Sequence, residues 1–175
     1  LISRLARRGP MVLLDSKFKA VVRDAFKCLS EAPAREVGAW SGRPPVVVFT
    51  DGACENEGTE ITHGATLFDP ETGRSLMFGD WVPDTWVQRW KAGGKKQLIC
   101  QAEIFPVLVS KATWTSELRN RAILWFIDNN AALSAVIRSF SPVIENYQLL
   151  VLNASLDLQL QSMHWYARVP SKSNL

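Results

Sequence analysis

Apolar and polar positions follow a helical spacing in the first part of the chain and a strand-like spacing after it. Over residues 11–33 the apolar side chains recur every three or four positions, which predicts one amphipathic helix. These positions include Leu14, Phe18, Val22, Phe26 and Leu29. The following REVGAWSGRPP is rich in Gly, Ser and Pro, as linkers are. We therefore expect a helical connecting segment over 1–44 and one domain over 45–175.

Short strand patterns and longer apolar segments alternate within the predicted domain. Strands are predicted at 46–53, 62–69, 74–82, 121–130 and 162–169, and helices at 97–114, 131–140 and 144–161. The order is three strands, helix, strand, two helices and a last strand. It predicts an α/β fold with a mixed five-stranded sheet, whose first three strands are antiparallel and whose later strands follow parallel crossovers. The helices would flank this sheet.

Two of the predicted strands end in an aspartate. Asp51 closes the apolar run of VVVFTDGA, and Asp128 closes that of RAILWFIDNN. If the two strands are parallel neighbours, both carboxylates lie at one edge of the sheet, about 5 Å apart, where α/β folds collect ligands. Like charges at this spacing repel each other unless a cation lies between them.

Glu103 is a third candidate, on the predicted helix 97–114. Its surroundings, ICQAEIFPVLV, are apolar, and the nearest basic residue of the helix, Lys111, is two turns away. Carboxylates without a basic partner favour a hard divalent cation such as Mg²⁺, and a pair of such ions can promote phosphodiester cleavage. The simpler alternatives are a turn at Asp51, a helix cap at Asp128 and a partly exposed Glu103.

Composition and charge narrow the class of protein. The 47% hydrophobic and 21% charged residues are typical of a globular chain, and no apolar run reaches the length of a membrane span. The arginines of LISRLARRGP argue against a signal peptide, and three cysteines without a CxxC pair suggest neither zinc nor disulfides. We expect an intracellular protein, in the cytoplasm or nucleus. Residues 1–44 carry nine Lys or Arg against four Asp or Glu, which fits contact with a polyanion or a solvated helix equally well.

Four motifs resemble those of the ribonuclease H family, and more narrowly of the ribonuclease H domain of retroelement reverse transcriptases. They are TDGA at 50–53, QAE at 101–103, FIDNNAA at 126–132 and WYARVPSKSNL at 165–175. The resemblance implies a two-metal endonuclease that uses Mg²⁺, or Mn²⁺ as a substitute, to cut the RNA strand of RNA·DNA hybrids. It also implies a polymerase domain of the same polyprotein as a partner. Asp51, Glu103 and Asp128 match three of the four metal-binding acids of the family.

The sequence departs from the family pattern in three ways. The fourth acid would be expected two residues after Leu175, so the resemblance implies a C-terminally truncated domain. The loop VPSKSN lacks the histidine of cellular ribonucleases H, while His63 and His164 fit structural positions better. Pro106 should kink the helix of Glu103, because it removes a helix hydrogen bond.

The resemblance also suggests where a hybrid would bind. Proteins recognise the RNA strand of an A-like duplex through its 2′-hydroxyls, which calls for small residues and amides beside the metals. Suitable residues by type and place are Gly52, Ala53, Asn129, Asn130 and Asn174. Turn and cap chemistry explains Asn129 and Asn130 as well. In the stretch 81–97, core packing is favoured for the tryptophans and phosphate contact for the lysines.

Two other functions remain open from the sequence. A ribonuclease H-like scaffold that has lost catalytic acids can serve as a nucleic-acid or protein binding module. A nuclease or recombinase with the same fold can act on DNA instead of a hybrid.

Overall fold

The computed structural model describes residues 15–32, 42–92, 94, 97–170 and 174. The chain divides into two compact units, Leu1–Pro33 and Ala34–Leu175. The domain boundary predicted at 44/45 stays a prediction. No helix among the described residues has the length and apolar character that a membrane crossing requires.

The first unit contains one described helix, α2 (Ser16–Glu31), in place of the helix predicted over 11–33. Residues 11–14 and 33 of that prediction lie outside the described residues. The helix begins after Asp15, whose carboxylate accepts a hydrogen bond from the Phe18 N–H at 2.7 Å. This contact satisfies one of the free N–H groups of the first turn.

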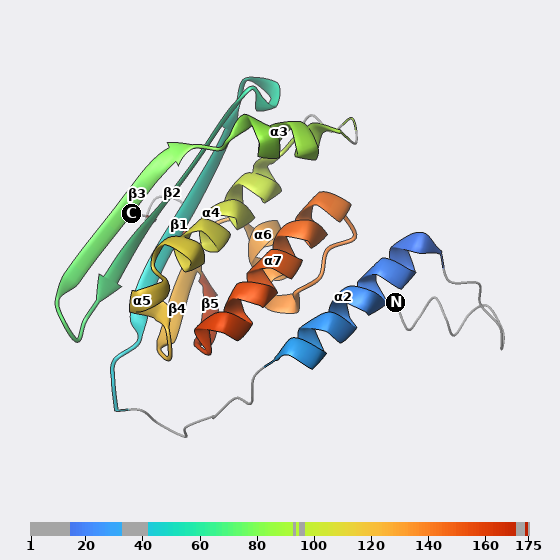
Figure 1. Cartoon of the computed structure of the whole chain (residues 1–175). Helices are drawn as coiled ribbons and strands as arrows, with labels where there is room; N and C mark the ends of the chain where they lie inside the picture. The colour runs from blue at the N-terminus through green and yellow to red at the C-terminus, as the bar shows by residue number, and fades with distance from the viewer. Residues whose placement is uncertain (1–14, 33–41, 93, 95–96, 171–173, 175) are drawn as a thin grey trace. The chain divides into compact units, whose positions relative to one another are not determined.

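The second unit is built on one mixed sheet of five strands (Figure 1). The strands are β1 (Val46–Glu55), β2 (Glu60–Asp69), β3 (Arg74–Trp81), β4 (Ala122–Ile127) and β5 (Met163–Arg168), and their order across the sheet is β3-β2-β1-β4-β5. The first three pair antiparallel, whereas β1 with β4 and β4 with β5 pair parallel. The predicted α/β fold class is therefore confirmed.

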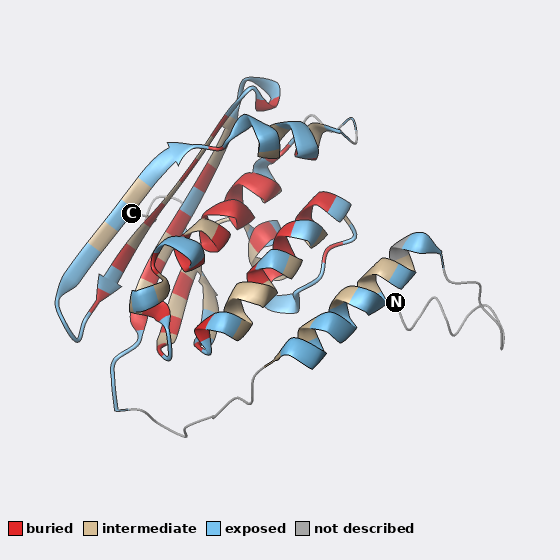
Figure 2. Cartoon of the chain, in the orientation of Figure 1, coloured by how far each residue is buried: buried red, intermediate tan, exposed pale blue. Residues whose placement is uncertain are grey.

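Helices cover one face of this sheet. The predicted helices are α4 (Ile99–Thr113), α6 (Asn130–Arg138) and α7 (Ile144–Leu160). Helix α4 packs against β1 and β2, and α7 packs against α4. Buried residues concentrate on α4 and alternate along the inner strands, as Figure 2 shows. Met77, Trp81 and Trp165 stay exposed on strand positions turned away from α4, so the core lies between the sheet and the helices.

Three short helical elements are absent from the sequence prediction. They are η1 (Asn56–Gly58), α3 (Asp84–Lys91) and α5 (Thr115–Leu118). In α3, Trp86 and Trp90 lie one turn apart, and both rings contact Phe105 of α4 edge-on. Trp90 is fully buried and Trp86 half-buried, which agrees with the core role favoured for the tryptophans, whereas Trp81 is exposed and lies outside the core. The spacing of four between the two tryptophans was the available signal for a helix.

A buried ionic network joins α4, α7, β4 and β5. The ammonium of Lys111, fully buried, lies 2.5 Å from Asp157 Oδ1 and donates a hydrogen bond to the Tyr166 hydroxyl at 2.9 Å. His164 Nε2 lies 3.0 Å from the same Asp157 oxygen, and Trp125 Nε1 donates to His164 Nδ1 at 3.0 Å. Burial lowers the pKa of Lys111, and the negative charge of Asp157 opposes this shift. The ammonium therefore depends on Asp157 to remain charged inside the core.

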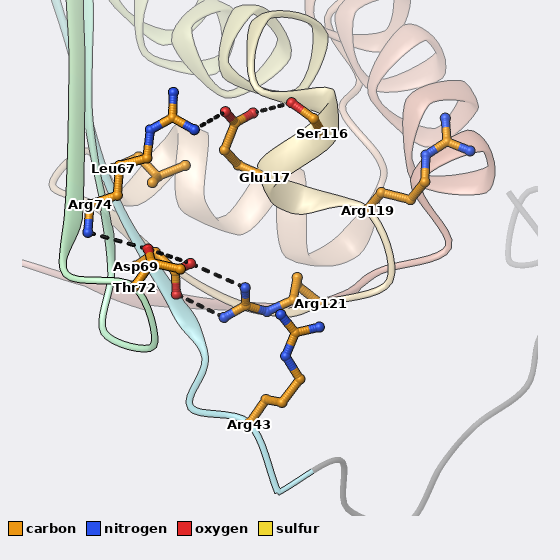
Figure 3. A pocket seen from close by; sticks show the side chains of 9 residues that line it. All are labelled: Arg43, Leu67, Asp69, Thr72, Arg74, Ser116, Glu117, Arg119 and Arg121. Carbon is orange, nitrogen blue, oxygen red and sulfur yellow. Dashed lines mark hydrogen bonds and ion pairs between the residues drawn. The ribbon is translucent and has the colours of Figure 1, made fainter.

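A second ionic cluster lies at the start of β4, around a pocket of about 320 Å³ (Figure 3). Arg121, which precedes β4, donates to Asp69 Oδ1 at 2.9 Å, and this bond holds the pKa of Asp69 below its usual value. Glu71 Oε2 accepts from Arg43 Nε at 2.8 Å and lies 3.3 Å from Arg121 Nη1. These pairs tie the β2–β3 turn to the segments that lead into β1 and β4.

Removing the carboxylate of the buried network should destabilise the domain. Asp157→Ala leaves the Lys111 charge buried without its ion partner, which typically costs about 3–5 kcal/mol. Urea denaturation should show this loss of stability. Adding Lys111→Met to the same chain should recover most of it, because this change removes the unpaired buried ammonium. A loss below about 1 kcal/mol for Asp157→Ala would contradict a dependence of Lys111 on this carboxylate.

Candidate metal centre

Asp51 and Asp128 lie side by side where β4 ends. The parallel pairing of β1 and β4 runs as far as Thr50 opposite Ile127, so the two aspartates are the next residues on adjacent strands. The prediction that Asp51 closes its own strand is wrong, because β1 continues to Glu55 in its pairing with β2. It is β4 that stops, and its end leaves room for side chains beside β1.

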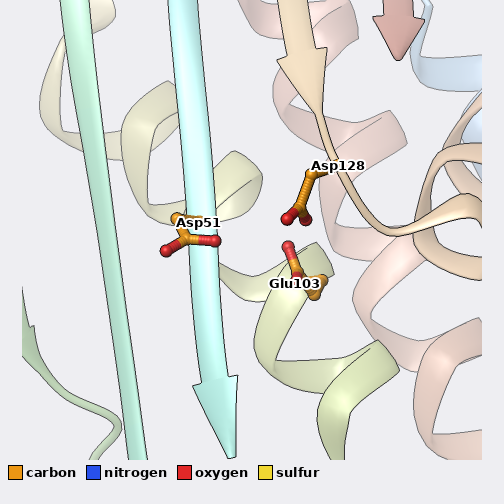
Figure 4. Close-up of side chains that lie close together, drawn as sticks. All are labelled: Asp51, Glu103 and Asp128. Atoms are coloured by element: carbon orange, nitrogen blue, oxygen red, sulfur yellow. The ribbon is translucent and has the colours of Figure 1, made fainter. Parts of the chain in front are cut away.

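Glu103 reaches the same place from α4. One carboxylate oxygen from each of Asp51, Glu103 and Asp128 lies within 4.8 Å of the others. Figure 4 shows the three side chains pointing toward one another from β1, α4 and the end of β4. Glu103 is only 4% exposed, Asp128 is half-buried and Asp51 is exposed. The cluster therefore opens to solvent on the side of Asp51.

The electrostatics of this cluster are unfavourable without a cation. Burial, and then the negative charge of Asp128 and its hydrogen bond to a protonated Glu103, raise the pKa of Glu103 to about 9. Asp51 adds to this rise, and a hydrogen bond from the Gly52 backbone opposes it. At neutral pH the metal-free site therefore keeps a proton on Glu103.

The chemistry of the cluster fits a hard divalent cation. When Glu103 and Asp128 are both ionised, their buried oxygens Oε2 and Oδ1 accept no hydrogen bond from the described residues. Within that part of the chain, no lysine or arginine forms an ion pair with any of the three acids. Oxygen ligands with excess negative charge suit Mg²⁺ or Mn²⁺, and the three acids would hold such an ion.

Gly52 allows α4 to lie close to β1. A Cβ at this position would lie 2.3 Å from the carbonyl oxygen of Ala102 and 2.8 Å from the Glu103 nitrogen.

Pro106 has no N–H for the Ala102 carbonyl four residues before it, yet α4 continues from Ile99 to Thr113 without a break. The Ala102 carbonyl therefore lacks its usual helix hydrogen bond, and it is this carbonyl that faces Gly52. Glycine here sets the distance between Asp51 and Glu103.

The predicted substrate residues have different surroundings. Asn129 caps α6, since its side chain accepts from the backbone of Ala131 and Ala132. Asn130 is exposed at the first position of α6, and Ala53 is half-buried in β1. The amide of Asn174 donates to the Thr50 carbonyl at 3.0 Å. Lys95 and Lys96, predicted to contact phosphate, lie outside the described residues.

The sequence did not identify Thr50 and Ala102 as parts of the site. Both act through backbone atoms: the Thr50 carbonyl accepts from Asn174, and the Ala102 carbonyl faces Gly52. The small residue in QAE was the available signal for the close approach of α4, whereas no local pattern marks the Thr50 carbonyl.

Adding a methyl group at Gly52 should disturb the site. Gly52→Ala would force α4 away from β1, costing about 1–3 kcal/mol of stability and weakening Mn²⁺ binding. Gly79→Ala in β3 is the matched control, because a Cβ there would meet only the His63 carbonyl oxygen at 3.9 Å. Urea denaturation and Mn²⁺ titration of both variants test the prediction. Equal behaviour of the two would contradict the proposed close packing.

The raised pKa of Glu103 predicts a pH-dependent stability. Its folded pKa of about 9 exceeds the 4.5 of an ordinary glutamate, so the folded metal-free protein binds more protons than the unfolded chain between these values. Stability in EDTA should therefore fall as the pH rises from about 5 to 9. Glu103→Gln should remove that component, as urea denaturation across this range would show. Parallel pH profiles for the two proteins would contradict the shift.

Comparison with known proteins gives a fold but no family. No protein-family model matches the chain, and neither does any curated protein. The structure of ribonuclease H1 from the halophilic archaeon Halobacterium salinarum is similar, with a TM-score of 0.58 and 14% identity over 75% of this chain and 89% of that one.

A ribonuclease H1 isolated from compost, LC11, is also similar. Its TM-score is 0.54, at 11% identity over 74% of this chain and 87% of that one. The same enzyme in complex with an RNA/DNA hybrid gives a TM-score of 0.51 at 10% identity, over 74% of this chain and 88% of that one. At these identities the comparison shows that the chain has a ribonuclease H-like fold.

Proposed function

We propose that this chain is a metal-dependent endonuclease that cleaves the RNA strand of RNA·DNA hybrids. The observation that carries the proposal is the meeting of Asp51, Glu103 and Asp128 at the end of β4, within a ribonuclease H-like fold. The similar LC11 ribonuclease H1 was crystallised with an RNA/DNA hybrid, which supports this class of substrate.

The three acids have different tasks in this proposal. They would hold Mg²⁺, or Mn²⁺ in its place; when bound, a pair of such ions activates water and stabilises the leaving oxygen of a phosphodiester. Glu103, buried on α4, would have to lose its proton in order to serve as a ligand. Asp51, on the solvent side, faces the direction from which a phosphodiester would approach. The close contact of Gly52 with α4 fixes the distance between Asp51 and Glu103.

Asn130 is the strongest candidate for a substrate contact through a side chain. It is exposed and lies two residues after Asp128, so its amide is available to a 2′-hydroxyl. Asn129 is engaged as a helix cap. Gly52 and Ala53 would contribute through their small size and their backbone next to Asp51.

The motifs from TDGA to WYARVPSKSNL support a more specific proposal. By their resemblance, the chain would be the ribonuclease H domain of a retroelement reverse transcriptase, with the polymerase domain of the same polyprotein as its partner. It would act in the cytoplasm or nucleus, where such hybrids form. This context rests on the sequence motifs.

A catalytically impaired binding module is the second candidate function. Among the described residues the acidic cluster has three members, whereas the family site has four. A site with three acids can retain metal and nucleic acid while cleaving slowly.

Cleavage of a labelled RNA·DNA hybrid in Mg²⁺ and in Mn²⁺ tests the proposal. We expect RNA-strand products, and a decrease of roughly 100-fold or more for Asp128→Asn, because this change removes a carboxylate that would hold the metal ions whose positive charge stabilises the leaving oxygen. Asp84→Asn, an exposed acid at the start of α3, is the matched control and should cleave normally.

Three results would count against the enzyme. Hybrid binding without cleavage would favour the binding module. Cleavage of duplex DNA in preference to the hybrid would favour a DNA nuclease of the same fold. Undiminished cleavage by Asp128→Asn would show that the products do not come from this site.

A further inference from the structure

Asn174 contacts β1 through its side-chain amide. Its side-chain nitrogen, Nδ2, donates to the Thr50 carbonyl at 3.0 Å and lies 3.5 Å from Asp51 Oδ1. Asn174 and Thr50 are 124 positions apart in the sequence. Of the residues that the structure describes, only Asn174 donates a side-chain hydrogen bond to the Asp51 carboxylate.

The Thr50 carbonyl fixes the orientation of the Asn174 amide. A carbonyl only accepts hydrogen bonds, so the side of the amide that faces it must be Nδ2 and not Oδ1. The two N–H groups of Nδ2 then serve Thr50 and Asp51. Both donors of the Asn174 amide are thus engaged, whereas its Oδ1 is buried and has no hydrogen-bond partner among the described residues. The substrate-contact role suggested for Asn174 stays a prediction.

The Asp51 carboxylate needs a group that orients it. Along β1 the residues on either side, Thr50 and Gly52, are buried, whereas Asp51 is exposed. An exposed aspartate has several rotamers of similar energy. The negative charge of Asp128 favours rotamers that point away from the cluster when no cation is bound. A fixed N–H donor at Asp51 Oδ1 favours the rotamer in which the three acids meet.

We propose that Asn174 is a positioning residue that holds the Asp51 carboxylate in its metal-binding orientation. The inference rests on the proposed function, since it takes Asp51 to be a metal ligand. In this role Asn174 acts through its Nδ2 contacts with the Thr50 carbonyl and Asp51, and not as a ligand of the metal. It lowers the free-energy cost of orienting the Asp51 carboxylate toward the site before an ion binds. Removing Asn174 should therefore weaken the affinity for metal.

Metal affinity separates this role from two simpler ones. A residue that only anchors the chain to the Thr50 carbonyl would change stability and leave the affinity of the folded protein for Mn²⁺ unchanged. A residue that contacts substrate would change the affinity for hybrid without metal. Only a positioning residue changes Mn²⁺ affinity in a way that depends on the Asp51 carboxylate.

The test is calorimetric titration of the 175-residue chain with Mn²⁺ alone, for the native protein, Asn174→Ala, Asp51→Asn and the double variant. We expect the Mn²⁺ dissociation constant of Asn174→Ala to rise about 5- to 10-fold, the effect of one ordinary hydrogen bond, because the contact of Nδ2 with Asp51 is long at 3.5 Å. In the Asp51→Asn background the same change should have little further effect, because the oriented carboxylate is already gone.

Two further measurements complete the test. Hybrid binding in EDTA should be the same for Asn174→Ala and the native chain. Cleavage by Asn174→Ala should be slow at low Mn²⁺ and recover when Mn²⁺ is saturating. Gln88→Ala, which shortens an exposed polar side chain on α3, is the control for all titrations, and urea denaturation confirms that each variant is folded.

Each contrary result has a separate meaning. If the native chain binds Mn²⁺ and cleaves hybrid while Asn174→Ala binds Mn²⁺ equally well, the positioning role is overturned and the proposed function stands. If Mn²⁺ binding is unchanged and hybrid binding weakens, Asn174 is a substrate contact. If the native chain binds no Mn²⁺, both the positioning role and the proposed function are wrong.

Discussion

Asp51, Glu103 and Asp128 meet at the end of β4, and the electrostatic cost of holding three acids this close constrains the packing around them. An almost fully buried Glu103 beside Asp128 is costly, and its pKa of about 9 in the metal-free protein expresses that cost. The fold nevertheless brings the acids together: β4 ends one residue before Asp128, and Gly52 has no side chain to keep α4 away. These features are explained if a cation belongs between the acids.

Other buried charges in the same domain are paired with opposite charges, unlike the three acids. The buried ammonium of Lys111 has Asp157 as its partner, and the guanidinium of Arg121 has Asp69. In both places opposite charges offset the loss of hydration, as buried ion pairs require. The acids around Asp51 have no such partner among the described residues. This charge imbalance lies at the carboxyl end of β4, where α/β folds bind ligands, and it makes the cluster a possible metal site in contrast to the two structural ion pairs.

Much of the fold and the core of the site could be predicted from the sequence. Two apolar strands that each lead to an aspartate, as at Asp51 and Asp128, bring both side chains to one place when the strands pair in parallel. The extension of β1 to Glu55 was not predicted because it depends on pairing with β2, which is tertiary. Helix α3 was missed because its eight residues carry only one apolar repeat. The contact of Asn174 with Thr50 spans 124 positions, and no local pattern encodes it.

Anomalous diffraction from crystals of the protein grown with Mn²⁺ would test the central claim most directly. We predict at least one Mn²⁺ peak between Asp51, Glu103 and Asp128, with carboxylate oxygens at about 2.0–2.2 Å, near the distances of Mg²⁺ sites. Density for Mn²⁺ only at other surface acids, with the three side chains arranged as they are without metal, would contradict it. In that case a proton held by Glu103, and not a metal ion, would be what stabilises the cluster.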